Sequence, residues 1–314
     1  MDTAGLREGS RAAEVRAASR DHRQHQLAVA AIIGSAVLFG TTGTAKELGP
    51  DSAGALGVGG IRILFGAATL WLIARRLPGW GDLRAHGALL VAGGLGVAAY
   101  QPGFFAGTER LGVALGTIIA LGSGPLFAGL LELLLGNRPN VRWLAATTLS
   151  IAGGALLVAP GAAEGGFSVT GLLAALTAGF GYALYAVVTK RLILRGLDAT
   201  VASAWQFSIG ALVLLPFLAW QPMGWLATPS GLAMALWLGV AATGVAYLLY
   251  GYGLRSLDTA TATTLTLAEP LTAALIAMIV LDERLTPVEW AGVAVVLVGL
   301  ALAGGGLRSR AWRT

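Results

Sequence analysis

Cysteine is absent from the 314 residues, which excludes disulfide bonds, thiolate metal sites and a thiol nucleophile. Histidine occurs only at positions 22, 25 and 86, in the N-terminal tail and beside the loop before the third apolar run, with no ligand partner nearby, so neither a metal site nor a Ser-His-Asp triad is predicted. Neither of the two lysines follows a glycine, so the phosphate-binding loop of ATPases is missing as well. We therefore expect no metal and no cofactor, and we do not expect an enzyme.

Charge is also scarce. Charged residues make up 12% of the chain, about half of their usual share in soluble domains. Apolar and aromatic residues make up 56%, and the mean hydropathy is +0.74. A soluble enzyme, a disordered chain and a coiled coil are excluded by this balance. The net charge of +5 fits a membrane surface better than a nucleic acid, because most cations stand between apolar runs.

Ten apolar runs are long enough to cross a hydrocarbon core of about 30 Å as helices. Only short connections separate them, which predicts an all-α polytopic membrane protein without a soluble domain. The predicted spans are residues 27–46, 53–74, 85–107, 112–135, 142–160, 169–190, 199–220, 230–252, 258–281 and 288–306.

The cations predict the orientation of the chain. With ten spans, both ends lie on one side; 17 of the 21 cations fall on that side, three on the other, and Arg62 lies within a span. Loops rich in Lys and Arg face the cytoplasm. Residues 1–26 and 307–314 are therefore expected to be cytoplasmic tails of a multi-pass protein in the inner (plasma) membrane.

An internal repeat divides the chain. The letters LGVAA occur at 95–99 and again at 238–242. Residues 27–160 and 169–306 thus look like two copies of a five-helix unit. Since five is odd, the second copy enters the membrane from the opposite side, and such inverted repeats are typical of transporters built around a central cavity. Further matched pairs, at offsets of 143 to 147, are Lys46 with Lys190, Arg110 with Arg255, Pro125 with Pro270, Arg138 with Arg284 and Trp143 with Trp290.

Short motifs stand in a specific order along both halves. They are Phe39-Gly40, Lys46 and Arg62 in the first half, and LTLAEP (265–270), LDERL (281–285) and EWAG (289–292) in the second. In this order the sequence resembles the drug/metabolite transporter superfamily, and within it the proteins with two EamA-type repeats. The resemblance implies a ten-helix basket with a central cavity that exports small metabolites such as aromatic or aliphatic amino acids. The first copy departs from the pattern, with Gly124-Pro125 where the second has Glu269-Pro270.

Two charges lie well inside predicted spans, where each costs at least about 2.5 kcal/mol and requires a reason. Arg62 is either an anchor for a substrate carboxylate or half of a structural ion pair. Glu269 is either a proton acceptor that couples export to a proton gradient or a structural side chain that joins packed helices. In the second case Arg62 is one possible partner. The sequence leaves both alternatives open.

Aromatic and amide side chains recur at helical spacing in several spans. If their faces converge, they form an amphipathic cavity wall; the alternative is packing against lipid or the core. These candidates for substrate binding are Phe39, Tyr100, Gln101, Phe104, Tyr182, Tyr185, Trp205, Gln206, Tyr247 and Tyr250. Prolines that could kink the spans are Pro102, Pro125, Pro216 and Pro270.

The sequence thus predicts a transporter that exports small neutral or zwitterionic metabolites, above all amino acids, by alternating access. A phosphate ester would require several interior cations, but Arg62 stands alone. An exporter of drugs or cationic compounds is the alternative, and an intramembrane enzyme or a membrane scaffold ranks lower. The expected partners are the substrate and the lipid bilayer, without nucleic acid; the oligomeric state stays open, and a monomer is compatible with the pattern.

Overall fold

Helices account for the architecture of the computed structural model, which describes residues 3–75, 79–159, 168–280 and 284–305. No strand occurs within these ranges. The elements are α1 (Thr3–Glu47), α2 (Ala55–Ala74), α3 (Trp80–Leu111), α4 (Val113–Leu134), α5 (Val141–Val158), α6 (Val169–Leu194), α7 (Ala199–Leu218), η2 (Gly224–Ala227), α8 (Pro229–Leu236), η3 (Trp237–Val245), α9 (Ala246–Ser256), α10 (Thr259–Leu265), α11 (Ala268–Val280) and α12 (Pro287–Gly304).

Ten helical segments within the described residues are long and apolar enough to cross a membrane, from Asp21–Glu47 to Pro287–Gly304. This confirms the predicted ten-helix membrane fold. The eighth segment combines α8, η3 and α9, and the ninth combines α10 and α11. The ring nitrogen Nε2 of His25 lies 3.0 Å from the carbonyl oxygen of Gly304, so α1 enters and α12 leaves the bundle on one face. We call this side the terminal face.

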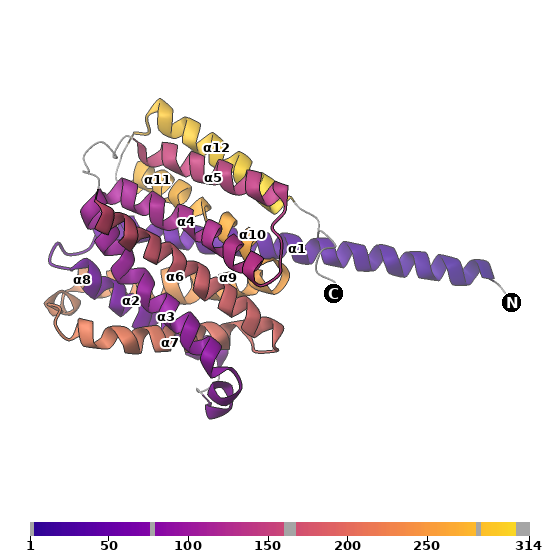
Figure 1. The fold of residues 1–314 in the computed structure, drawn as a ribbon, viewed down its shortest axis with the longest axis horizontal. Helices are drawn as coiled ribbons and strands as arrows, with labels where there is room; N and C mark the ends of the chain where they lie inside the picture. Colours follow the sequence, from indigo (N-terminus) through magenta and orange to yellow (C-terminus); the bar gives the residue numbers. More distant parts are fainter. Residues whose placement is uncertain (1–2, 76–78, 160–167, 281–283, 306–314) are drawn as a thin grey trace.

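The first helix is longer than its apolar run. Residues 1–26 were expected to be a polar tail, but α1 begins at Thr3 and projects well beyond the bundle (Figure 1). The extension is rich in Ala and Arg, which favour helix formation. Its composition explains why it continues the helix.

Helices from the two halves pack closely and antiparallel. On α3 and α6, a Cβ added to Gly96 would lie 2.6 Å from the carbonyl oxygen of Gly181, and one added to Gly103 would lie 2.8 Å from that of Ala174. Small residues permit such backbone contact where lipid offers no hydrophobic driving force. The corresponding helices α1 and α9 also run antiparallel, with Gly253 packed on Ile32 and Gly34 on Leu249.

The contacts between α5 and α12 are reciprocal. A Cβ on Gly153 would lie 2.6 Å from the backbone nitrogen of Val296, and one on Gly299 would lie 2.8 Å from that of Ser150. Adding 146 to the positions of Ser150 and Gly153 gives those of Val296 and Gly299, so exchanging the halves exchanges the two contacts. Reciprocity between antiparallel helices is what a two-fold axis in the membrane plane produces, which supports the inverted repeat.

Two spans of the second half depart from regular α-helix. In η3 the chain forms a π-helix, in which the hydroxyl of Thr243 donates to the carbonyl of Leu238 at 2.7 Å. The ninth span is interrupted at Thr266 and Leu267, just before Pro270. Proline lacks the N–H that would continue the helix. Pro102, Pro125 and Pro216 instead lie within helices that continue through them.

The inverted threading can be tested in this cysteine-free chain with one reporter cysteine at a time. Ser52 and Arg195 occupy corresponding connections, α1–α2 and α6–α7. We expect Ser52→Cys to react with a membrane-impermeant maleimide on intact cells, and Arg195→Cys to react only after permeabilisation. Equal labelling of both sites in intact cells would contradict the inversion.

Candidate functional site

Two opposite charges lie in the interior, one from each half of the chain. Arg62 is on α2, and Glu269 is in the first turn of α11, immediately after the break in the ninth span. Both side chains are partly exposed. Each acts electrostatically on the other, but they form no direct ion pair.

Tyrosine rings from three helices, α3, α6 and α9, lie near these charges. The charges of Arg62 and Glu269 both act on the hydroxyl of Tyr100. The charge of Glu269 also acts on the hydroxyl of Tyr182, and the charge of Arg62 acts on that of Tyr247. All three tyrosines are partly exposed. The structure thus brings Arg62, Glu269 and these tyrosines into one polar and aromatic site.

The rings form two pairs between the halves. Tyr100 contacts Tyr182 with centroids 6.4 Å apart, and Phe39 contacts Tyr247 at 5.0 Å. Each half supplies one ring to each pair. Phe104 extends the first pair by stacking on Tyr100 at 5.9 Å.

A second group of candidates is fully buried beneath this site. Tyr185 contacts Ser203 through its hydroxyl at 2.8 Å, and Tyr250 lies beside it with ring centroids 6.2 Å apart. Gln206 donates to the hydroxyl of Thr189 at 2.9 Å, while its Oε1 has no hydrogen-bond partner. In this conformation these side chains pack the core and are not reached by solvent.

Two further candidates occupy other places. Gln101 is buried against α2, where a Cβ on Gly59 would lie 2.7 Å from its Oε1. Trp205 lies towards the terminal face, where its indole N–H donates to Asp82 at 3.1 Å and its ring meets Trp71 edge to face at 5.6 Å. The structure therefore separates Trp205 from the aromatic site.

Thr243 is a site residue that the sequence analysis did not identify. Its hydroxyl accepts a hydrogen bond from Nε of Arg62 at 3.2 Å while it donates to Leu238 within the π-helix. π-Helical turns inside helices recur at functional sites. The only signal in the sequence was that Thr243 directly follows the repeated LGVAA letters, which form ordinary helix in the first copy.

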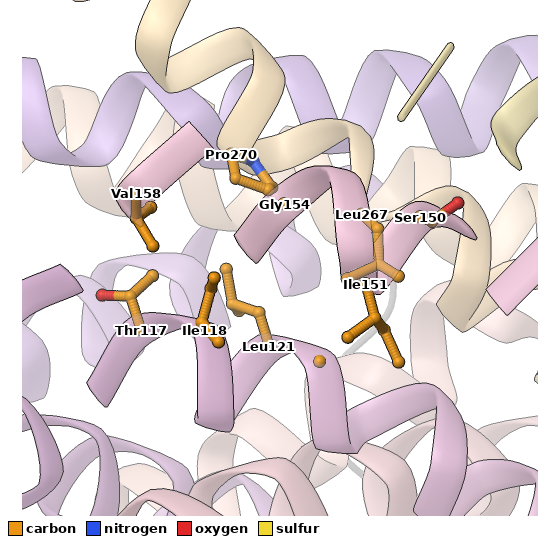
Figure 2. A pocket seen from close by; sticks show the side chains of 10 residues that line it. Thr117, Ile118, Leu121, Ser150, Ile151, Gly154, Val158, Leu267 and Pro270 are labelled. Carbon is orange, nitrogen blue, oxygen red and sulfur yellow. The ribbon is translucent and has the colours of Figure 1, made fainter. Parts of the chain in front are cut away.

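A separate small cavity lies between α4, α5 and the break in the ninth span (Figure 2). Its wall is mostly aliphatic, with Ile118, Ile151 and Leu267 around it, and the buried hydroxyl of Ser150 at its edge has no hydrogen-bond partner. It has room for about one water molecule. A cavity of this size and lining does not bind a metabolite.

The site presents one fixed cation, one carboxylate, tyrosine hydroxyls and apolar ring faces. Among the described residues, no group of three or more His, Asp or Glu side chains is placed to hold a metal ion.

Comparison with known proteins identifies the family. The model of the EamA-like transporter family matches residues 26–159 and again residues 169–305. The chain belongs to the EamA-like transporter family. It is therefore a polytopic membrane transporter, and the predicted resemblance is confirmed.

Relatives of this EamA-family chain carry transporter names. It is 38% identical over 272 residues to the uncharacterized transporter YwfM of Bacillus subtilis, covering 85% of this chain and 90% of that protein. It is 28% identical to the uncharacterized inner membrane transporter YicL of Salmonella typhimurium, covering 71% and 75% of the two chains. It is 26% identical to a probable terminal-alkyne amino-acid exporter of Streptantibioticus cattleyicolor, covering 88% and 92%. A known crystal structure matches with a TM-score of 0.74 at 22% identity, covering 88% of this chain and 96% of that one, which shows the shared fold.

The contact between Thr243 and Arg62 predicts a loss of stability when the hydroxyl is removed. Thr243→Val keeps the shape but leaves the Arg62 Nε and the Leu238 carbonyl without this partner, which we expect to cost about 1–2 kcal/mol. Thermal unfolding of the purified protein in detergent measures the effect. Thr243→Ser retains the hydroxyl and serves as the control, and a valine variant as stable as the serine variant would contradict the contact.

Proposed function

We propose that this transporter exports small neutral or zwitterionic metabolites, most readily amino acids, out of the cell by alternating access. The terminal face is the cytoplasmic one in this proposal, and the membrane is the inner or plasma membrane. The arginine-rich loops on that face support the orientation, and the name of the Salmonella relative supports the membrane.

The observation that carries the proposal is the separation of Arg62 from Glu269. Opposite charges inside a membrane protein normally pair with each other. Here they interact without direct contact, so a ligand with an ammonium and a carboxylate can satisfy both at once. A ligand with only a cation would pair with Glu269 but would repel Arg62 and leave it unpaired. A ligand with only a carboxylate would pair with Arg62 but would repel Glu269 and leave it unpaired.

The rings around the charges suit the body of such a substrate. Tyr100, Tyr182 and Tyr247 are partly exposed and pack on neighbouring rings, so they supply an aromatic and hydroxyl-bearing surface in this proposal. Aliphatic and aromatic side chains pack equally well on such a wall. The amino-acid exporter among the relatives supports this class of substrate.

Proteoliposomes loaded with a mixed amino-acid pool test the function directly. We expect at least one amino acid to leave faster than from protein-free vesicles, and a comparison with and without a pH gradient shows whether protons are coupled. If no amino acid leaves faster in either condition, the proposed function is wrong.

Neutral variants of the two charges test the binding chemistry. We expect Arg62→Gln and Glu269→Gln each to lower the initial rate of amino-acid efflux about tenfold or more, because each removes a charge-assisted contact to the substrate. Arg138→Gln, which neutralises an exposed cation of the α4–α5 connection, is the matched control. Loss of drug efflux in Glu269→Gln with unchanged amino-acid efflux would instead favour the exporter of cationic compounds.

A further inference from the structure

Three polar side chains fasten the helix ends on the terminal face. The ammonium of Lys190 on α6 donates to the carbonyls of Leu254 at 2.6 Å and Leu257 at 2.8 Å, where α9 ends. The guanidinium of Arg255, also at the end of α9, pairs with Asp198 at 2.6 Å. We call Lys190, Asp198 and Arg255 the terminal-face latch.

The latch ties α9 to both α6 and α7. A lysine at the carboxyl end of a helix satisfies carbonyls that have no partner within the helix and complements the helix dipole. Asp198 caps α7 as well, because its Oδ1 accepts from the backbone N–H of Thr200 at 2.9 Å. The Arg255–Asp198 pair is about half exposed and is weak by itself. The partly buried lysine is therefore the main component of the latch.

The sequence repeat places the same residue types on the opposite face. Lys46, at the end of α1, corresponds to Lys190 at an offset of 144, and Arg110, at the end of α3, corresponds to Arg255 at an offset of 145. Asp51 lies in the α1–α2 connection, which corresponds to the α6–α7 connection that contains Asp198. In sequence, Asp51 is three residues closer to Lys46 than Asp198 is to Lys190. We call Lys46, Asp51 and Arg110 the opposite-face set.

The opposite-face set is open in this structure. All three side chains are exposed, and none makes a hydrogen bond or ion pair with a residue in the described parts of the chain. The same residue types are thus engaged on one face and disengaged on the other. Equivalent parts of the two repeats are held in two different arrangements.

Burial along the ninth span shows the same difference. Its terminal-face half, α10, is almost completely buried, with Thr259, Thr263, Thr264 and Leu265 at 0% exposure. Its opposite-face half, α11, is partly exposed at every position from Thr272 to Met278. The helices are therefore packed tightly behind the latch and loosely on the other side of Glu269.

We propose that the opposite-face set is a second latch, which closes that face when the terminal-face latch opens. In that state Lys46 caps the carboxyl end of α3, and Arg110 pairs with Asp51. The two latches then stabilise opposite states of one equilibrium, so that weakening either one shifts the population towards the state held by the other. The proposal rests on the two-repeat architecture and not on the identity of the substrate.

Reporter cysteines on the two sides of the site measure this equilibrium without any substrate. Thr263→Cys reports opening of the terminal face, and Thr272→Cys reports opening of the opposite face. Each reporter is labelled with a membrane-impermeant maleimide, the first in inside-out vesicles and the second in right-side-out vesicles. We expect Lys190→Gln to raise labelling at 263 and lower it at 272, shifting the ratio about tenfold, the factor for losing one charge-assisted hydrogen bond.

The decisive variant is Lys46→Gln, which we expect to shift the same ratio in the opposite direction. The double variant Lys46→Gln/Lys190→Gln should return the ratio towards that of the native background, a compensation that misfolding does not produce. Arg138→Gln, an exposed cation outside both sets, is the control and should leave the ratio unchanged. A shift by Lys46→Gln in the same direction as Lys190→Gln, or no shift, would overturn the second latch even if amino-acid export is established.

Discussion

Arg62 and Glu269 hold opposite charges apart inside a membrane protein, and the architecture is organised around that separation. A single charge at the bilayer centre costs at least about 2.5 kcal/mol, so two charges that could neutralise each other would be expected to do so. They come instead from α2 and α11, with Thr243 holding the guanidinium Nε and tyrosine rings around both. In the proposed function, the attraction that remains is available to the substrate.

The backbone makes this arrangement possible through close contacts and breaks. Glycines let α3 approach α6 and let α5 approach α12 at backbone distance, which binds the halves together where lipid provides little driving force. Non-helical backbone is tolerated within a membrane protein where it is buried in protein or lines a water-filled space. The interruption at Thr266 and Leu267 occurs next to Glu269, and the π-helical Thr243 contacts Arg62. The irregular segments of the second half therefore lie beside the two charges.

Duplication explains the symmetric features, and divergence explains the rest. The close contacts of Gly153 with Val296 and of Gly299 with Ser150 exchange when the halves are exchanged. The two interior charges do not exchange in this way, because Glu269 corresponds to Gly124 and Arg62 has no cationic counterpart in the second copy. A duplicated module thus provides similar helix contacts in both halves, and single substitutions in each copy provide the two interior charges.

The sequence predicted the ten helices, the repeat and the two interior charges, because long apolar runs and charges within them are unmistakable in a membrane chain. It did not predict which aromatic side chains reach solvent. Tyr182 and Tyr185 share one helix at a spacing of three, yet only Tyr182 is partly exposed. In lipid the outward and inward faces of a helix are both apolar, so hydrophobic periodicity does not fix its rotation. Trp205 likewise depends on Asp82, 123 residues earlier, a contact that no local pattern encodes.

The central claim is that both charges bind one substrate together, and the most direct measurement compares ligands that carry one charge or both. Binding to the purified protein would be measured for a transported amino acid, its amide and its N-acetyl derivative. The account predicts that loss of either charged group weakens binding about tenfold or more. Equal binding of the amide or of the N-acetyl derivative would contradict it, because one of the two interior charges would then contribute nothing to recognition.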